Sequence, residues 1–305
     1  MRLGEIAALS HPGRRRRHNE DSYVVQPPLF AVADGMGGAK AGEVASGLAA
    51  AAVQESGNDG ESGEAHVAAL IEEANRRVFR RASEDRDASG MGTTMTVALV
   101  EDDSVAIGHV GDSRAYLIRD GRLEQLTDDH SLVAELVRSG KLTPEEAESH
   151  PQRSVITRAL GTEADVDVDT FSVEAAPGDL FLLCSDGLTT MVADETILAA
   201  VEENRPDLKS AAKALVNAAN RGGGEDNITV VFFEVGGAQE PGEQTEDTVI
   251  TSRLTDDEAT MDESDRQPAI EVVEEKRRSR VLPYLGALAV LLIIAAAVLW
   301  LLGQS

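Results

Sequence analysis

Short runs of apolar residues recur along the first 236 residues and predict β-strands, with segments of helical periodicity between them. Helices are expected where apolar residues recur three and four positions apart, over 41–55, 66–83, 193–204 and 208–220. Strands are expected near 3–9, 22–34, 92–101, 104–110, 114–119, 166–174, 179–185 and 228–235. Periodicity by itself therefore predicts an α+β domain over residues 1–236.

Residues 129–161 interrupt this series with two short helical patterns, over 131–139 and from Thr143 onward. An insertion of this kind suits a flap that closes over a site and selects substrates. It suits equally a subdomain that only packs, and the sequence leaves both interpretations open.

The end of the chain has a different pattern. Residues 237–275 carry thirteen carboxylates against two basic residues and show no hydrophobic periodicity, so 237–280 is predicted to be an acidic disordered linker ending in the basic run KRRSR. Residues 281–302 are uncharged and would span about 33 Å as a helix, enough to cross a hydrocarbon core of about 30 Å. We therefore predict one transmembrane helix in the lipid bilayer, followed by a short tail, 303–305.

The basic run sets the expected topology and location. By the positive-inside rule it faces the cytoplasm, together with the domain before it, so the protein is expected in the cell membrane as a single-pass protein. The net charge of −26 argues against nucleic acid as a partner. The single cysteine, Cys184, excludes a disulfide framework and suits a reducing compartment.

Carboxylates stand where the apolar runs end or begin. The runs 29–33 and 180–184 are followed by the Asp-Gly pairs of Asp34 and Asp186, and Asp226 comes just before the run 228–235. Each motif alone is more often a turn. Together they indicate a shared cation, because a charge at the end of a buried strand is unfavourable without compensation. Oxygen donors without a Cys-His cluster favour magnesium or manganese over zinc.

A further aspartate, Asp112, lies in the sequence Gly111-Asp-Ser-Arg114, between the apolar runs 104–110 and 114–119. This spacing predicts a hairpin turn that joins two neighbouring strands. Ser113 and Arg114 are interpreted as structural.

These motifs, in this order, resemble those of the metal-dependent protein phosphatases, the PPM or type 2C serine/threonine phosphatases, above all their bacterial membrane-anchored members. The resemblance covers about residues 1–236 and implies a four-layer α-β-β-α sandwich of two antiparallel sheets flanked by helices. The matching segments are RRRRHNED (14–21), LFAVADGMGGAKAGEVAS (29–46), GMGTTMTVALV (90–100), IGHVGDSRAYLIRDGRLEQLTDDHS (107–131), HPQRSVITRALG (150–161), GDLFLLCSDGL (178–188) and GGEDNITVVFFEV (223–235).

Carried over by position, the resemblance implies a site with two Mn²⁺ or Mg²⁺ ions and a third, weaker ion. The residues are Asp34 as the carboxylate that bridges the first two ions, Asp186 and Asp226 on the first, Glu20 and the Gly35 carbonyl on the second, and Asp112 with Asp186 on the third. It also implies that Asn227 orients Asp226.

The phosphate-binding residue is identified by register alone. Arg16 lies four residues before Glu20, where the family places its phosphate-binding arginine, and a guanidinium matches two phosphate oxygens. The other three arginines of the run 14–17 are interpreted as solvated.

The function implied is hydrolysis of phosphoserine and phosphothreonine in proteins by a hydroxide that bridges the two ions, without a covalent phosphoenzyme. Met36 stands where many eukaryotic members have a histidine, and methionine cannot donate a proton, so the leaving group takes its proton from water or another residue. The expected partners are phosphorylated proteins, in bacterial relatives often membrane serine/threonine kinases and their substrates.

Two alternatives remain: a phosphatase that resets a phosphorylated transcriptional regulator, and a catalytically idle fold that binds phosphoproteins as an adaptor. The adaptor is disfavoured because every predicted ligand position is intact.

Overall fold

The computed structural model describes residues 2–37, 41–56, 62–236 and 251–253. Their strands form two sheets, and antiparallel pairs make up both sheets except where β12 joins β1 in parallel. The first sheet has the order β12-β1-β11-β10-β7-β8, with β1 (Arg2–His11), β7 (Arg114–Arg119), β8 (Arg122–Gln125), β10 (Leu180–Cys184), β11 (Ile228–Gly236) and β12 (Thr251–Arg253). The second has the order β2-β3-β5-β6-β9, with β4 on β3: β2 (Asp21–Gln26), β3 (Leu29–Met36), β4 (Gly92–Thr93), β5 (Met95–Val100), β6 (Ser104–Val110) and β9 (Asp169–Glu174).

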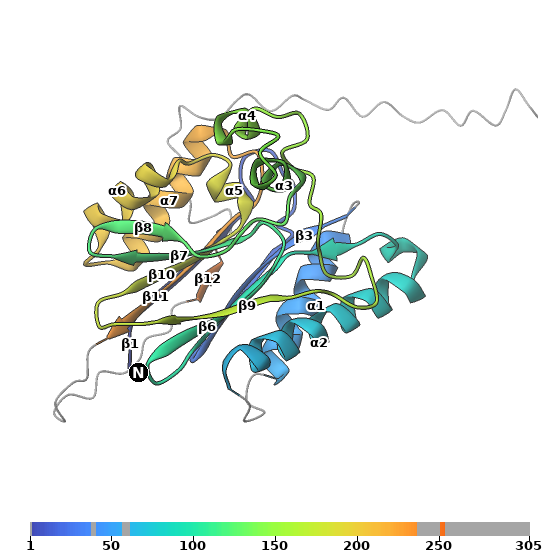
Figure 1. The fold of residues 1–305 in the computed structure, drawn as a ribbon, viewed down its shortest axis with the longest axis horizontal. Helices are drawn as coiled ribbons and strands as arrows, with labels where there is room; N and C mark the ends of the chain where they lie inside the picture. Colours follow the sequence, from blue (N-terminus) through green and yellow to red (C-terminus); the bar gives the residue numbers. More distant parts are fainter. Residues whose placement is uncertain (1, 38–40, 57–61, 237–250, 254–305) are drawn as a thin grey trace, which may run out of the picture. The chain divides into compact units, whose positions relative to one another are not determined.

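Helices cover the outer face of each sheet (Figure 1). α1 (Ala41–Ser56) and α2 (Gly63–Glu84) pack on the second sheet, and α6 (Asp194–Asn204) and α7 (Leu208–Gly222) on the first. The predicted α-β-β-α layering and the four long helices are thus confirmed. Shorter helices are η1 (Arg86–Ala88), α3 (Leu132–Arg138), α4 (Pro144–Glu148) and α5 (Asp186–Thr189).

Three apolar layers hold this arrangement together. Between the sheets, the rings of Phe30 and Phe181 stack on that of Phe233, with centroids 4.3 and 5.0 Å away. Alanines such as Ala45 and Ala49 are completely buried on α1, which lets that helix lie close to the second sheet. Because both faces of each sheet are buried, the central strands are apolar throughout instead of alternating.

The hairpin predicted around Asp112 is wrong. β6 belongs to the second sheet, where β5 and β9 take both of its edges, and β7 belongs to the first, between β10 and β8. Residues 111–113 therefore carry the chain from one sheet to the other. Gly111 allows this crossing: its φ is 115°, and a Cβ there would lie 2.6 Å from the side chain of Thr94.

Two other segments differ from the expectation. The apolar run 22–34 is two strands, β2 and β3, joined by a turn at Pro27 and Pro28. Residues 251–253, inside the predicted disordered linker, form β12 and pair with residues 8–10 of β1.

Among the helices in the described ranges, none combines the length and the apolar composition that a membrane crossing requires. The predicted basic run 276–280, membrane helix 281–302 and tail 303–305 lie outside the described residues.

Candidate metal centre

The second sheet contributes Asp34, in the last part of β3. Asp34 pairs in register with Asp21 at the start of β2, so two carboxylates stand side by side at the same end of the sheet. The backbone of Asp34 is fixed by Thr94: its N–H donates to Thr94 Oγ1, and its carbonyl accepts from the Thr94 N–H, both at 2.9 Å. The position of the Asp34 carboxylate is therefore set by the sheet.

The first sheet contributes Asp186 and Asp226. Because β10 and β11 are antiparallel neighbours, the residues after β10 lie beside those before β11. Asp186 is the first residue of α5, and Gly187 behind it packs so tightly on the Asn227 carbonyl that a Cβ would collide with it. The glycine of this Asp-Gly pair is thus required by close packing.

The crossover between the sheets contributes Asp112, which is buried. Burial, and then repulsion by Asp186, raise the pKa of Asp112 to about 8. The role of Asp112 in a third metal site stays a prediction, and only its place in the chain can be compared with the expectation. Asp112 reaches the site because the chain changes sheets there, which brings it to the end where Asp34 and Asp186 lie.

The carboxylates repel one another. Burial raises the pKa of Asp34 well above its ordinary value, and repulsion by Asp21, Asp186, Asp112 and Asp226 raises it further. Burial and the charge of Asp226 raise the pKa of Asp186 to about 6. So many charges in one low-dielectric place are stable only as protonated acids or with a cation.

Two buried oxygens point to a ligand. Within the described residues, Asp186 Oδ1 and Asp21 Oδ1 are buried and accept no hydrogen bond. Buried carboxylate oxygens are normally paired with a donor or a cation. Hard oxygen donors of this kind fit Mg²⁺ or Mn²⁺.

Asp21 is a buried carboxylate beside Asp34 to which the sequence analysis gave no role. Its Oδ2 accepts hydrogen bonds from Thr229 Oγ1 at 2.6 Å and from Ser185 Oγ at 2.8 Å, which ties β2 to the first sheet. Burial raises its pKa to about 7, although both hydroxyls oppose the shift. The available signal was its position, since Asp21 opens an apolar run just as Asp226 does.

Arg16 and Glu20 lie at the edge of this cluster. Arg16 Nη2 is 2.6 Å from Asp226 Oδ2 and forms an ion pair with it. The Glu20 carboxylate lies against Gly42 at the start of α1, where a Cβ would collide with it. Burial raises the pKa of Glu20, and the charge of Arg16 opposes this shift.

Gly35 and Asn227 hold the loops of the site together. The Gly35 N–H donates to the Glu20 carbonyl at 3.2 Å, and a Cβ on Gly35 would collide with the carbonyls of Glu20 and Gly42. Asn227 binds Asp226 Oδ1 through its backbone N–H at 2.8 Å. Its side chain instead fastens the loop before β2, through the Pro12 and His18 carbonyls and the Glu20 N–H.

In the described residues, the side chains are not arranged as a complete coordination shell for a metal ion. In the described part of the chain, no three His, Cys, Asp or Glu side chains are grouped so that they could hold one ion. Asp226 binds Arg16, and the Asp34 and Asp186 carboxyls lie within hydrogen-bonding reach of each other. The donor chemistry fits the predicted ions, and in this arrangement Asp226 Oδ2 is paired with Arg16.

Known proteins are similar to this chain in sequence. The serine/threonine phosphatase stp of Listeria monocytogenes is 42% identical over 233 residues, which cover 73% of this chain and 92% of that one. The serine/threonine protein phosphatase PstP of Mycobacterium tuberculosis is 46% identical over 231 residues, 75% of this chain. The match spans only 44% of that relative's length.

Solved structures agree. The catalytic domain of PstP in complex with two manganese ions is 43% identical, has a TM-score of 0.70, and aligns over 77% of this chain and 99% of that one. The PPM phosphatase MsPP of Mycobacterium smegmatis, in complex with cacodylate, is 36% identical with a TM-score of 0.71 over 77% of this chain and 99% of that one. The sequence model of the protein phosphatase 2C family matches residues 14–224. The chain therefore belongs to the protein phosphatase 2C family.

Proposed function

We propose that this chain is a metal-dependent serine/threonine protein phosphatase with Mn²⁺ or Mg²⁺ bound at the carboxylate cluster. The observation that carries the proposal is the meeting of buried and half-buried carboxylates from both sheets at one end of the sandwich, where burial and repulsion raise the pKa values of Asp34, Asp112 and Asp186. The names of the relatives support the reaction, and the two manganese ions in the PstP structure support the metal. The proposed ligands are Asp34, the Gly35 carbonyl, Glu20, Asp186 and Asp226, with Asp112 and Asp186 for a third ion.

When bound, the ions supply an activated water and a clamp for the phosphate. Arg16, released from Asp226, binds two phosphate oxygens and orients the ester for in-line attack. Asp21 holds Ser185 and Thr229, and so keeps the first sheet in register with Asp34. Met36 has no proton to give, so the serine or threonine oxygen that leaves takes its proton from water or from another residue.

The substrates we propose are phosphorylated proteins that face the cytoplasm, including membrane serine/threonine kinases and their targets. The uncharged segment 281–302 and the basic run before it support a membrane tether with the catalytic domain on the cytoplasmic side. A tether raises the concentration of the enzyme near substrates in the same membrane.

Asp34→Asn should abolish manganese-dependent hydrolysis of p-nitrophenyl phosphate and of a phosphothreonine peptide, because no other residue is proposed to bridge the two ions. Asp120→Asn is the matched control: it changes an exposed carboxylate in the turn between β7 and β8 and should leave turnover unchanged. Turnover of Asp34→Asn close to the parent's would contradict the dinuclear site and support the adaptor.

Stabilisation by Mn²⁺ should grow as the pH rises. In the folded protein the pKa values of Asp186 and Asp21 are about 6 and 7, above the ordinary value near 4. Without metal, these two protonated carboxyls therefore contribute their full stabilisation below about pH 4. This contribution is lost as the pH rises through 6–7. Metal binds the deprotonated native form. The gain in Tm on adding excess Mn²⁺, measured by differential scanning fluorimetry, should be larger at pH 8 than at pH 5.5. An equal gain at both pH values would contradict the assignment.

Arg16→Ala should raise KM for a phosphopeptide roughly 30- to 150-fold, because about 2–3 kcal/mol of charge-assisted hydrogen bonding to phosphate is lost. The affinity for Mn²⁺, measured by calorimetry, should not fall, since Arg16 competes with the ion for Asp226 Oδ2. Arg15→Ala is the control. A larger effect on KM from Arg15→Ala would show that the register is wrong.

Deletion of residues 281–305 should move the protein from the membrane fraction to the soluble fraction and leave hydrolysis of p-nitrophenyl phosphate intact. Action on membrane-bound phosphoproteins should fall, because the tether no longer concentrates the enzyme near them. Protease added to inside-out vesicles should digest the full-length protein. Digestion of the catalytic domain from outside intact cells would reverse the topology.

A further inference from the structure

A cleft of about 840 Å³ opens beside the carboxylate cluster, and Asp112 and Asp186 line it. One wall is residues 131–156 of the inserted segment 129–161, with α3 and α4, and this part is called the flap below. The other wall is residues 189–195, from the end of α5 to the start of α6. Val133, Val137 and Ala147 are aliphatic residues of the flap wall, and Val192, which is largely buried, lies opposite. Charged residues, among them Arg138, Arg153 and Glu195, complete the lining.

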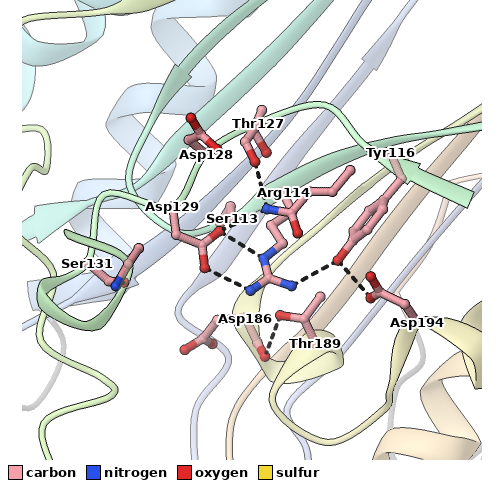
Figure 2. Close-up of polar contacts among 12 residues, drawn as sticks. Ser113, Arg114, Tyr116, Thr127, Asp128, Asp129, Ser131, Asp186, Thr189 and Asp194 are labelled. Atoms are coloured by element: carbon pink, nitrogen blue, oxygen red, sulfur yellow. Dashed lines mark hydrogen bonds and ion pairs between the residues drawn. The ribbon is translucent and has the colours of Figure 1, made fainter. Parts of the chain in front are cut away.

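A single guanidinium connects the two walls. Arg114 Nε and Nη2 each donate to the carboxylate of Asp129, both at 2.8 Å, just before the flap begins. Arg114 Nη1 donates to Tyr116 Oη at 3.0 Å, and that hydroxyl donates to Asp194 Oδ1, at 3.2 Å, on the first residue of α6. Figure 2 shows the guanidinium between Asp129 on one side and Tyr116 with Asp194 on the other, above Asp186.

The geometry of this link is restricted. The fork of an arginine fits a carboxylate in one planar arrangement, and Tyr116 is completely buried, so neither partner can turn away freely. Only 24% of the Arg114 side chain and 17% of the Asp129 side chain are exposed, so breaking the pair would leave a largely buried charge. The base of the flap is also joined to the residue before Asp112, because the His130 N–H donates to the Gly111 carbonyl at 2.7 Å.

We propose that the cleft binds the polypeptide that flanks the phosphorylated residue, and that Arg114 is a positioning residue that holds the two walls at the separation this polypeptide needs. The proposal rests on the phosphatase function and adds to it a contact between the cleft and the polypeptide of the substrate. The cleft shares its floor with the carboxylate cluster, so a phosphate bound there places the neighbouring side chains of a protein substrate between the walls. Aliphatic neighbours fit the valines of the lining. A small ester reaches the cluster without filling the cleft.

The test compares two substrates in full-length protein with excess Mn²⁺: a phosphothreonine peptide with aliphatic neighbours, and p-nitrophenyl phosphate. Arg114→Met should lower kcat/KM for the peptide by about tenfold or more, mainly through KM, and for the small ester by less than about threefold. Tyr116→Phe removes the hydroxyl that joins Arg114 to Asp194 and leaves the pair of Arg114 with Asp129, so it should shift the same ratio to a smaller extent. Arg119→Met is the matched control.

The control is close in chemistry and remote from the cleft. Arg119 lies on the same strand and holds Asp179 through two hydrogen bonds of 2.7 and 2.5 Å, but it does not line the cleft. Arg119→Met should therefore leave the ratio of peptide to ester turnover unchanged. If it changes that ratio as much as Arg114→Met does, the proposal is overturned.

Hydrogen exchange gives a readout that does not depend on activity. In Arg114→Met, amides of both walls should exchange faster, and in Tyr116→Phe only those of residues 189–204. Equal loss of activity on both substrates, or faster exchange throughout the domain, would show that Arg114 only supports the fold. If Arg114→Met does not fold, the proposal is tested by the ratio of peptide to ester turnover and by the hydrogen exchange of Tyr116→Phe. A parent inactive on both substrates would refute the phosphatase, whereas the exchange patterns would still test the link between the walls.

Discussion

Repulsion among buried carboxylates is the constraint around which this end of the molecule is built. Asp34 comes from one sheet, Asp186 and Asp226 from the other, and Asp112 from the chain that crosses between them. The charges of Asp186, Asp112 and Asp226 raise the pKa of Asp34, so the sandwich must hold these groups together by other means. Close backbone packing lies beside the cluster: a Cβ on Gly187 would collide with the Asn227 carbonyl oxygen, and a Cβ on Gly35 would collide with that of Gly42. The backbone thus holds the carboxylates where protonation or a cation relieves their repulsion.

The local pattern of apolar and polar residues was enough to predict much of the fold. The long helices follow from apolar spacing, and the central strands are readable because both of their faces are buried. What local pattern lacks is the partner of each strand. The hairpin expected at Asp112 failed for this reason: β6 and β7 are consecutive strands, but β5 and β9 already take both edges of β6, so β7 had to join the other sheet. Two strands in sequence are only usually neighbours in space.

Local sequence pattern does not reveal which distant residues meet, and this separates the parts of the site that could be predicted from those that could not. Asp34 and Asp186 were recognisable because a carboxylate at the end of a buried strand needs compensation. Asp21 was not, because its hydroxyl partners Ser185 and Thr229 are more than 160 positions away. The ion pair of Arg16 with Asp226 joins the two ends of the domain and has no local signal. Residue type predicts which groups carry chemistry, whereas topology decides which of them meet.

The crossover 111–114 shows how topology can couple two tasks. Asp112 faces the carboxylate cluster, Ser113 Oγ shares a 2.7 Å hydrogen bond with the Thr94 hydroxyl beneath Asp34, and Arg114 reaches both walls of the cleft. These residues are consecutive, so the segment that brings Asp112 to the carboxylates also carries the arginine that holds Asp129. The sheet crossing, which no local pattern predicted, therefore places a candidate metal ligand and the link between the two cleft walls side by side in the chain.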